Sequence, residues 1–343
     1  MEMLELNLRG DSHYELGKSH GAILRKTIQE FVQQGVAGIN RTRKSPIAMT
    51  ALPELISPYL KKISQQLPDF EDEIRGLADG AQIPLEAAVL LQIRREVIGT
   101  NQYTLTGDCS SVGIFKNEGT ILAQTIDLDG SMTNLGNVFR ISKRGKPEIL
   151  QYCFAGLLGY MGMNSAGLAV AINLVVSDGW SDGISPYLLA RKFLEQESID
   201  ECLQVVKTVS VASSRSFLIV DRTRLVTLEI TPDDYRVIEG IYQTHANHFL
   251  HPDFAKVDRL NVFSKNSSIK RMIALDSYIK ADQNETSIKR AFADHSIYPV
   301  GICAHSDGMH NETVASVIMH PHQGKFLALK GKPCQNQYVE FRI

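Results

Sequence analysis

The chain has 343 residues, of which 43% are hydrophobic and 22% charged, and its formal net charge is −2. These values are ordinary for a globular protein, and the length is enough for one large domain or two average ones. The small net charge argues against a strong overall field that would gather nucleic acid or anionic lipid. We therefore expect neither a nucleic-acid partner nor a membrane partner.

The N-terminal sequence MEMLELNLRGDSH lacks the basic region and the long apolar region of a secretory signal. No stretch approaches the ~20 apolar residues that span a bilayer. The five cysteines are widely spaced and odd in number, and they form no CxxC pair: Cys109, Cys153, Cys202, Cys303 and Cys334. This usage predicts a cytoplasmic protein with free thiols, without a disulfide framework or a zinc knuckle.

Helical patterns occupy the first hundred residues. Residues 13–36 carry apolar side chains at helical spacing, and residues 51–67, 68–81 and 83–99 predict three further helices. Pro53 suits the first turn of the second of these helices, because a missing N–H costs nothing there.

The pattern changes at residue 109. Apolar and polar residues then alternate around Asn117-Glu118-Gly119, which predicts a hairpin. Further strands are predicted at residues 167–176, 216–221, 225–230, 313–320 and 325–331, and helices at 184–196, 198–209 and 267–281. Ser198 is the expected N-cap of one of these helices. Helices followed by a strand-rich section favour an α+β layered fold over a doubly wound parallel sheet. No linker separates residues 1–108 from residues 109–343, so we expect one domain.

Cys109 is the first candidate for chemistry. It begins a predicted strand directly after TLTGD, and its neighbours are Asp108, Ser110 and Ser111. Reactive thiols need a polar, partly exposed setting that favours the thiolate. From the residues alone, a nucleophile and an inert cysteine both remain open at this position.

Other catalytic patterns are weaker. Six histidines fall in two groups, His245 and His248 in THANH, and His305, His310, His320 and His322 near the C-terminus. Their HxH and HxxH spacings do not resemble HExxH, and no cysteine pair accompanies them, so we expect no metal. The sequence contains no GxSxG elbow and no GxGxxG or GxxxxGK[ST] loop, which argues against a serine hydrolase and against nucleotide phosphate binding.

Eight segments in order resemble the acyl-CoA:6-aminopenicillanic acid acyltransferase family, a peptidase C45-like group of N-terminal-nucleophile hydrolases. They are RGDSHYELGKSHG, PDFEDEIRGLADGA, LLQIRREV, DCSS, AQTIDLD, GLLGYMGMNSAGLAVAIN, THANHF, and the C-terminal pair YPVGIC and KGKP. The resemblance covers nearly the whole chain. It implies a four-layer αββα sandwich, in which two antiparallel sheets lie between helical layers.

The resemblance also implies a processing site. The chain would cut itself between Asp108 and Cys109, giving fragments 1–108 and 109–343 that remain partners. The family often has glycine before the nucleophile, where this chain has aspartate. The freed α-amino group of Cys109, with an ordinary pKa near ~8, would take the thiol proton, so one residue would supply both nucleophile and base.

Further site residues follow from the same resemblance. Asp127 would hold the new ammonium group, and Asn247 of THANHF would donate to the tetrahedral oxygen. Ser110, Asn173 and His310 are the expected substrate-binding residues. His310 stands about where the family has an arginine near its last strands.

The implied activity is that of a cysteine amidohydrolase or acyltransferase that acts on a small amide or acyl thioester. It would need no cofactor, and acyl-CoA is a possible substrate. Water as acceptor would give hydrolysis, and an amine would give acyl transfer. Two alternatives stay open: an amidase like the more distantly related bile-salt and penicillin V hydrolases, and a non-catalytic protein that retains the fold. A homo-oligomer also stays open.

Overall fold

The computed structural model describes residues 3–42, 47–99, 109–298, 300–306 and 311–343. In chain order the elements are β1 (Glu5–Gly10), α1 (His13–Ile23), α2 (Arg25–Thr42), α3 (Leu52–Gln66), α4 (Pro68–Ala81), α5 (Leu85–Ile98), β2 (Cys109–Ile114), β3 (Ile121–Leu128), β4 (Gly136–Lys143), β5 (Ile149–Phe154), β6 (Met161–Asn164), β7 (Ala169–Leu174), α6 (Pro186–Phe193), α7 (Ile199–Thr208), β8 (Arg215–Val220), β9 (Leu225–Ile230), β10 (Tyr235–Glu239), β11 (Tyr242–His245), α8 (Pro252–Ala255), α9 (Val262–Ile279), α10 (Glu285–Phe292), β12 (Glu312–His320), β13 (Lys325–Lys330) and β14 (Val339–Arg342).

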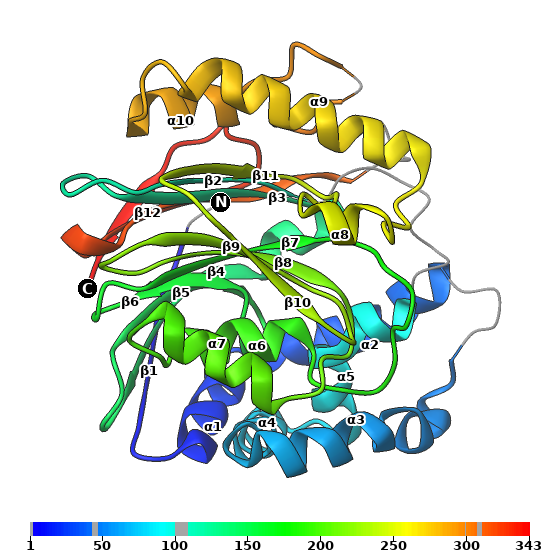
Figure 1. Ribbon diagram of the computed structural model, residues 1–343. Coiled ribbons are helices and arrows are strands. Elements are labelled where there is room, and N and C mark those ends of the chain that lie inside the picture. Colours follow the sequence, from blue (N-terminus) through cyan, green and yellow to red (C-terminus); the bar gives the residue numbers. More distant parts are fainter. Residues whose placement is uncertain (1–2, 43–46, 100–108, 299, 307–310) are drawn as a thin grey trace.

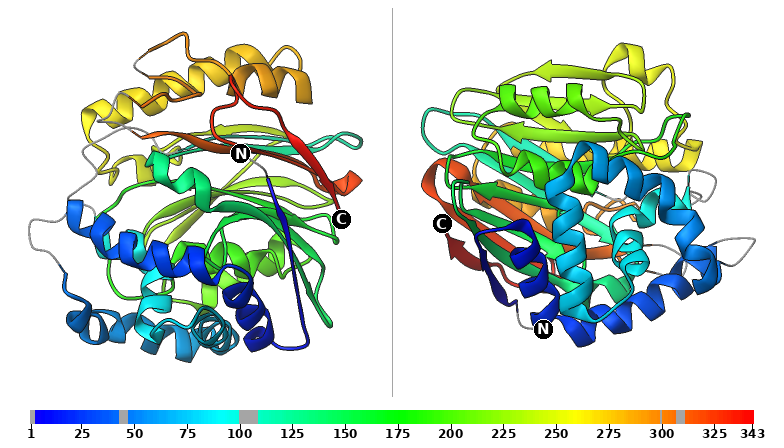
Figure 2. Two further views of the ribbon diagram at one scale, coloured as in Figure 1. Left: turned by 180° about the vertical axis from the view of Figure 1, so that it is seen from behind. Right: turned by 90° about the horizontal axis from the view of Figure 1, so that it is seen from below.

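Two stacked sheets form the centre of the molecule. The larger has eight strands in the order β1-β4-β5-β6-β7-β8-β9-β10, and the smaller has six in the order β11-β2-β3-β12-β13-β14. Helices α9 and α10 cover the smaller sheet, and α1 to α7 cover the larger sheet from the opposite side (Figure 1). Figure 2, seen from below, shows the N-terminal helices and the pair α6 and α7 sharing that face. The predicted α+β fold, a four-layer αββα sandwich, is confirmed.

Most of the buried apolar side chains divide between two cores. A large cluster fills the space between the sheets and extends beneath the larger sheet into α1 to α7, for example with Phe70, Phe139 and Phe193. A smaller cluster, which includes Leu275 and Phe292, lies between the six-stranded sheet and helices α9 and α10. The core under helices α9 and α10 therefore contains fewer buried apolar residues than the large core.

Helices α1 and α4 approach each other closely through glycine. A Cβ atom at Gly17 would lie 1.9 Å from the carbonyl oxygen of Glu73, and one at Gly76 would lie 2.0 Å from that of Tyr14. Any larger side chain at these positions would push the backbones apart. Gly17 and Gly76 thus serve the close packing of α1 against α4.

Several predicted elements agree with the structure in detail. Helix α4 spans the predicted residues 68–81, and the Ser198 side chain accepts from the N–H of Glu201 at the start of α7. Gly119, in the β2–β3 hairpin, has a φ of 80°. A single helix over residues 13–36 was wrong, because the chain leaves helical geometry at Leu24, where φ is −107°.

Strand β1 was not predicted, because the first hundred residues were read as helical. It pairs in parallel with β4 and forms one edge of the eight-stranded sheet. Among the described residues, no helix combines the length and the apolar character needed to cross a membrane.

Candidate active site

The strand register brings Cys109 and Asn247 together. Cys109 is the first residue of β2 and pairs with Ile126 of β3. On the other edge of β2, Ser111 pairs with His245 of β11. Continued by two residues, this antiparallel register puts position 247 opposite position 109. Accordingly, the backbone N–H of Cys109 donates to Oδ1 of Asn247 at 3.3 Å.

Arg271 of α9 lies between the same two residues. Its Nη1 donates to the carbonyl oxygen of Cys109 at 2.6 Å and to Oγ of Ser110 at 2.9 Å, and its Nη2 donates to Oδ1 of Asn247 at 2.7 Å. The arginine is 2% exposed. A guanidinium group is planar and donates in fixed directions, so these three bonds hold the start of β2 in one orientation.

The orientation of the Asn247 amide follows from its partners. Arg271 can only donate, so it faces Oδ1, while Nδ2 donates to the carbonyl oxygen of Leu174 at 3.0 Å. The backbone N–H of Asn247 donates to Oγ of Ser268 at 2.7 Å. Asn247 therefore has contacts with β2, β7 and α9 at once, and it is buried.

The two faces of β2 have different neighbours. Ser110 faces α9, through its bond to Arg271. Ser111 faces the other sheet, where its hydroxyl donates to Oδ1 of Asn173 at 2.7 Å. Because side chains alternate along a strand, the thiol of Cys109 lies on the inner face with Ser111. Nδ2 of Asn173 is buried and has no hydrogen-bond partner among the described residues.

Asp127 lies on β3, one residue beyond the partner of Cys109. It is 1% exposed, and its Oδ1 accepts from the hydroxyl of Thr313 at 2.6 Å. Alternation places its carboxylate on the α9 side of the sheet, as it places Ser110. Asp127 and the thiol of Cys109 thus leave the sheet on opposite faces, although their backbones are neighbours.

A narrow pocket of about 280 Å³ lies between the sheets beside Cys109. Its lining residues are Arg95, Cys109, Leu128, Tyr160, Ile172, Leu174, Tyr187 and Arg215. Only about 10 Å³ of it admits the centre of a water molecule. That is room for about one water, so a substrate needs the pocket to widen.

Two arginines, Arg95 and Arg215, line this pocket. Arg215 is buried, with its guanidinium carbon 5.5 Å from the ring centre of Tyr187. Nη2 of Arg215 has no hydrogen-bond partner among the described residues, and the nearest carboxylate oxygen, on Glu96, is 3.9 Å away. An unsatisfied buried guanidinium nitrogen is costly unless something accepts from it. The pocket is therefore suited to an anionic group.

The chain is similar to proteins of a known family. The family "Acyl-coenzyme A:6-aminopenicillanic acid acyl-transferase" matches residues 115–333, which is more than half of the chain. The chain belongs to this family. Membership places it among the acyltransferases and amide hydrolases.

Two curated relatives extend the match along the chain. The acyl-coenzyme A:6-aminopenicillanic-acid-acyltransferase 40 kDa form of Emericella nidulans is 23% identical over 345 residues, covering 96% of this chain and 93% of the relative. The β-alanyl-dopamine/carcinine hydrolase of Drosophila melanogaster is 23% identical over 330 residues, covering 83% of this chain and 81% of the relative. One relative is named as a transferase and the other as a hydrolase.

Two solved structures match part of the chain with low sequence identity. Penicillin V acylase from Agrobacterium tumefaciens has a TM-score of 0.46 and 13% identity, over 68% of this chain and 86% of that chain. A variant of conjugated bile acid hydrolase from Clostridium perfringens has a TM-score of 0.47 and 13% identity, over 68% and 97%.

The structure brings together only some of the site residues that were predicted from the sequence. Cys109, Ser110 and Asn247 share one hydrogen-bond network through Arg271. Asn173 reaches Ser111, the second residue after the proposed nucleophile. The predictions for Asp108 and His310 fall outside the described residues.

Arg271 was missed by the sequence analysis, which read residues 267–281 simply as a helix. A signal was present. The buried positions of α9 lie on one face of the helix: Ser264, Ser267, Ser268, Arg271, Leu275 and Ile279. An arginine within the inward stripe of an amphipathic helix must find buried acceptors, and that requirement points to a site.

Proposed function

We propose that the chain cuts itself before Cys109 and then uses Cys109 as an N-terminal nucleophile in amide hydrolysis or acyl transfer. The observation that carries the proposal is the network around the backbone of Cys109, in which Asn247 accepts from its N–H and Arg271 donates to its carbonyl oxygen. Cleavage would turn that N–H into a free amine, and the acceptor for it is already in place.

The cut itself balances without a cofactor. The thiol of Cys109 attacks the carbonyl carbon of Asp108, the peptide nitrogen leaves as the new α-amine, and a thioester forms. Water then hydrolyses the thioester and frees the thiol. Residues 1–108 and 109–343 become two fragments.

Arg271 would tune the new amine. A fixed positive charge that contacts both the carbonyl oxygen of Cys109 and Oδ1 of Asn247 disfavours a second positive charge beside it. The pKa of the α-amine would then fall from its ordinary ~8 toward neutrality. A neutral amine can take the thiol proton as Cys109 attacks a substrate amide and return a proton to the leaving amine.

Two buried amides are candidates to stabilise the tetrahedral oxygen. Nδ2 of Asn247 carries two N–H groups, one of which donates to the carbonyl oxygen of Leu174. Nδ2 of Asn173 has no hydrogen-bond partner among the described residues and lies on the inner face of β2. A buried donor fixed in advance at that point stabilises charge that develops only during reaction.

Asp127 would act by its charge, through space or through a bound water. It lies on the N-terminal side of Cys109 along β3, and Thr313 fixes one of its oxygens. A carboxylate there favours the protonated amine after proton transfer, which offsets the opposite effect of Arg271. Together the two residues would keep the amine able to cycle between its two forms.

The basic pocket suggests the substrate class. We propose that the group bound beside Cys109 carries a carboxylate that Arg215 and Arg95 recognise. A matched pair of amides, one with this carboxylate and one with its uncharged methyl ester, tests the idea. The acid should have at least ~10-fold higher kcat/KM, and Arg215→Gln should remove the difference. Equal values in the wild type would contradict it.

The two fragments would stay together without a covalent link. Strand β1 is part of the eight-stranded sheet, and helices α1, α2 and α5 contribute to the large apolar core. Fragment 1–108 therefore supplies both a sheet edge and part of the core.

Denaturing electrophoresis of the purified protein tests the cleavage. Two bands of 108 and 343 − 108 = 235 residues are expected, and N-terminal sequencing of the larger should read CSSVGIF. Cys109→Ala should remain a single inactive chain, while Cys153→Ser, which alters a buried thiol elsewhere, should be cut normally. Full-length protein that is active would contradict the proposal.

A further inference from the structure

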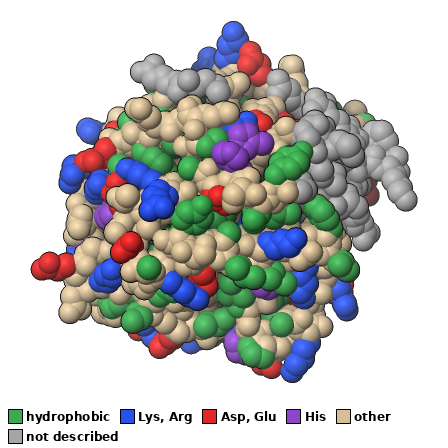
Figure 3. Space-filling model, turned by 90° about the horizontal axis from the view of Figure 1, so that it is seen from above, with side chains coloured by type: hydrophobic (Ala, Val, Ile, Leu, Met, Phe, Trp, Pro, Cys, Tyr) green, Lys and Arg blue, Asp and Glu red, His purple; other side chains and the backbone are tan. Residues whose placement is uncertain are grey.

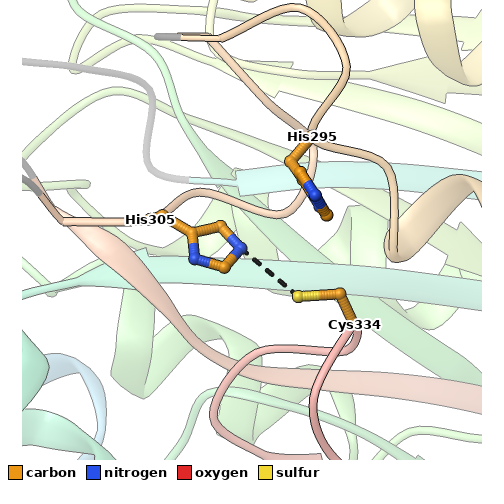
Figure 4. A group of neighbouring side chains, drawn as sticks. All are labelled: His295, His305 and Cys334. Carbon is orange, nitrogen blue, oxygen red and sulfur yellow. Dashed lines mark hydrogen bonds between the residues drawn. The ribbon is translucent and has the colours of Figure 1, made fainter.

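A second group of reactive side chains lies apart from Cys109. His295, His305 and Cys334 each offer one ligand atom, and these atoms all lie within 4.8 Å of one another. Figure 4 shows the three side chains converging from separate segments, with His305 pointing at the sulfur of Cys334. Nε2 of His305 lies 3.3 Å from that sulfur.

Cys303 supplies a fourth candidate atom. Its sulfur lies 3.6 Å from the sulfur of Cys334 and 3.8 Å from Nε2 of His305. In a tetrahedral zinc site with Zn–S near ~2.3 Å and Zn–N near ~2.0 Å, neighbouring ligand atoms are roughly 3.3–3.8 Å apart. The three measured separations within the Cys303, His305 and Cys334 set fall in that range.

Backbone contacts hold the group in place. The N–H of Cys303 donates to the carbonyl oxygen of Asp294 at 2.9 Å, which closes the loop that carries His295. Gly301 allows this closure, because a Cβ atom there would lie 2.9 Å from the carbonyl oxygen of Cys303 and 3.3 Å from Cα of His295. His295, Cys303 and His305 thus come from the loop between α10 and β12, and Cys334 comes from the segment between β13 and β14.

The histidine nitrogens also have suitable roles. Nδ1 of His295 lies 3.2 Å from the carbonyl oxygen of Ala293, an acceptor, so this nitrogen carries the proton and Nε2 keeps its lone pair. Metal-bound histidines commonly donate their second ring N–H in this way. Nε2 of His305 faces both sulfurs.

We propose that Cys303, His305, Cys334 and His295 bind one zinc ion in a structural site. Two thiols lose their protons as the ion binds, and the resulting pair of thiolates balances its double charge, so no net charge is buried. Four protein ligands complete the tetrahedron and leave no position for substrate. Soft sulfur with imidazole nitrogen selects zinc over magnesium or calcium.

The site would stabilise the neighbourhood of Asp127. Between Cys303 and His305, the backbone N–H of Ala304 donates to Oγ1 of Thr313 at 2.8 Å, and that same hydroxyl donates to Asp127 at 2.6 Å. An ion that fixes residues 303–305 would therefore also fix the partner of Asp127. Zinc loss should loosen this connection while leaving Cys109 chemically intact.

The surface on the side of helices α9 and α10 carries side chains of both charges. Seen from above, acidic and basic side chains are interspersed around hydrophobic ones (Figure 3). A surface with charges of one sign would bind counter-ions weakly and in no fixed number per chain. The proposal instead requires a fixed stoichiometry, which is what the experiment measures.

Zinc binding is tested on the whole protein, prepared without a histidine tag, reduced, stripped with a chelator and titrated with zinc sulfate against a chromophoric chelator. About one zinc per chain is expected. Cobalt in its place should give the visible spectrum of tetrahedral thiolate coordination. His295→Gln, at an exposed position, should fold normally and bind zinc at least ~10-fold more weakly. Cys334→Ser should bind more weakly still.

Two controls separate this site from the other cysteines and histidines. Cys153→Ser and His251→Gln change residues outside the group and should bind zinc as the wild type does. Uptake well below one zinc per reduced chain would overturn the proposal, and so would equal affinity in Cys334→Ser and the wild type. A Cys303–Cys334 disulfide in protein that takes up no zinc after reduction would overturn it in favour of a redox pair.

Discussion

Two buried arginines on opposite sides of the molecule show how differently its helical layers work. Arg191 of α6, beneath the larger sheet, is 2.8 Å from Glu195 and 3.7 Å from Glu73. Burial alone would lower the pKa of Arg191, but these carboxylates raise it above its usual value. Arg271 of α9, above the smaller sheet, donates instead to a carbonyl, a hydroxyl and an amide.

The two arginines differ in role, one structural and one at the candidate site. An arginine held by two carboxylates has its charge balanced and serves to join helices. The cation of Arg271 directly contacts the backbone of Cys109, so its charge acts on whatever forms there. Arg191 therefore joins the helices of the scaffold layer under the larger sheet, whereas the layer over the smaller sheet contributes Arg271 to the candidate site.

The largest effect is expected from Arg191→Met. Removing this cation takes from buried Glu195 its nearest cation, at 2.8 Å, and from buried Glu73 a second partner beside His13, which lies 2.6 Å from Glu73. Breaking a buried ion pair by removing one partner typically costs ~3–5 kcal/mol. Urea unfolding of the variant and the wild type measures the difference. The folded fraction should keep the wild-type kcat/KM. A change below ~1 kcal/mol would show that the ion pairs add nothing net to the stability of this layer.

Arg271→Met should have the opposite signature. Losing the donor to the Cys109 carbonyl and the Asn247 amide should lower kcat by ~100-fold or more, with a smaller change in KM. Arg271→Lys should restore part of kcat and shift the pH profile, because the charge returns without the planar geometry. Lys270→Met, one residue away on the exposed side of α9, is the matched control. Normal kcat in Arg271→Met would remove this arginine from the site.

Asp127→Asn should have a smaller effect. The amide oxygen can still accept from Thr313, so the hydrogen bond at 2.6 Å can persist while the charge is lost. We expect kcat/KM to fall by ~10-fold, together with a shift of the pH profile, and the melting temperature to change little. Thr313→Val is the companion variant, because it removes the hydrogen bond and keeps the charge. A collapsed melting temperature in Asp127→Asn would favour a purely structural aspartate.

Much of the fold could be predicted because the signals are local. The spacing of apolar residues and the proline and glycine at its two ends defined α4, and alternation around Gly119 defined the β2–β3 hairpin. Strand β1 could not be recognised in this way. It is a single edge strand whose hydrogen bonds go to β4, which lies more than a hundred residues later.

The site was only partly predictable for the same reason. Cys109 and Asn247 stood out through resemblance to a family, and the register of β11 with β2 explains why they meet. The contributions of Arg271 and of Arg215 depend on helix and strand packing. The sequence spacing of known metal-binding motifs is likewise missing from the proposed zinc ligands, His295, Cys303, His305 and Cys334. The prediction of no metal was based on such spacing.

The smallest expected effect concerns His20 in the scaffold layer. Nε2 of His20 accepts from the N–H of Gly156 at 3.1 Å, and burial lowers the pKa of this histidine to about 3. In the unfolded chain its pKa is near ~6.5. Between these values the unfolded state binds one proton more than the folded state, so stability falls as the pH falls through ~6.5 and below.

His20→Gln tests this contribution, since a glutamine oxygen can still accept from Gly156. At pH 5.5 the free energy of unfolding of the wild type should be ~1.4 kcal/mol lower than at neutral pH because of this histidine. The reason is that pH 5.5 is about one unit below the unfolded-state pKa of ~6.5. The size of this loss is insensitive to the folded pKa as long as that value is well below 5. Urea unfolding at pH 7.5 and 5.5 gives the change in the free energy of unfolding with pH for each protein. Comparing this change between the variant and the wild type cancels the contributions of the titrating groups that both proteins share. An equal pH dependence in the variant and the wild type would mean that His20 becomes protonated within the fold, and that this layer tolerates a buried charge as readily as the layer of Arg271 does.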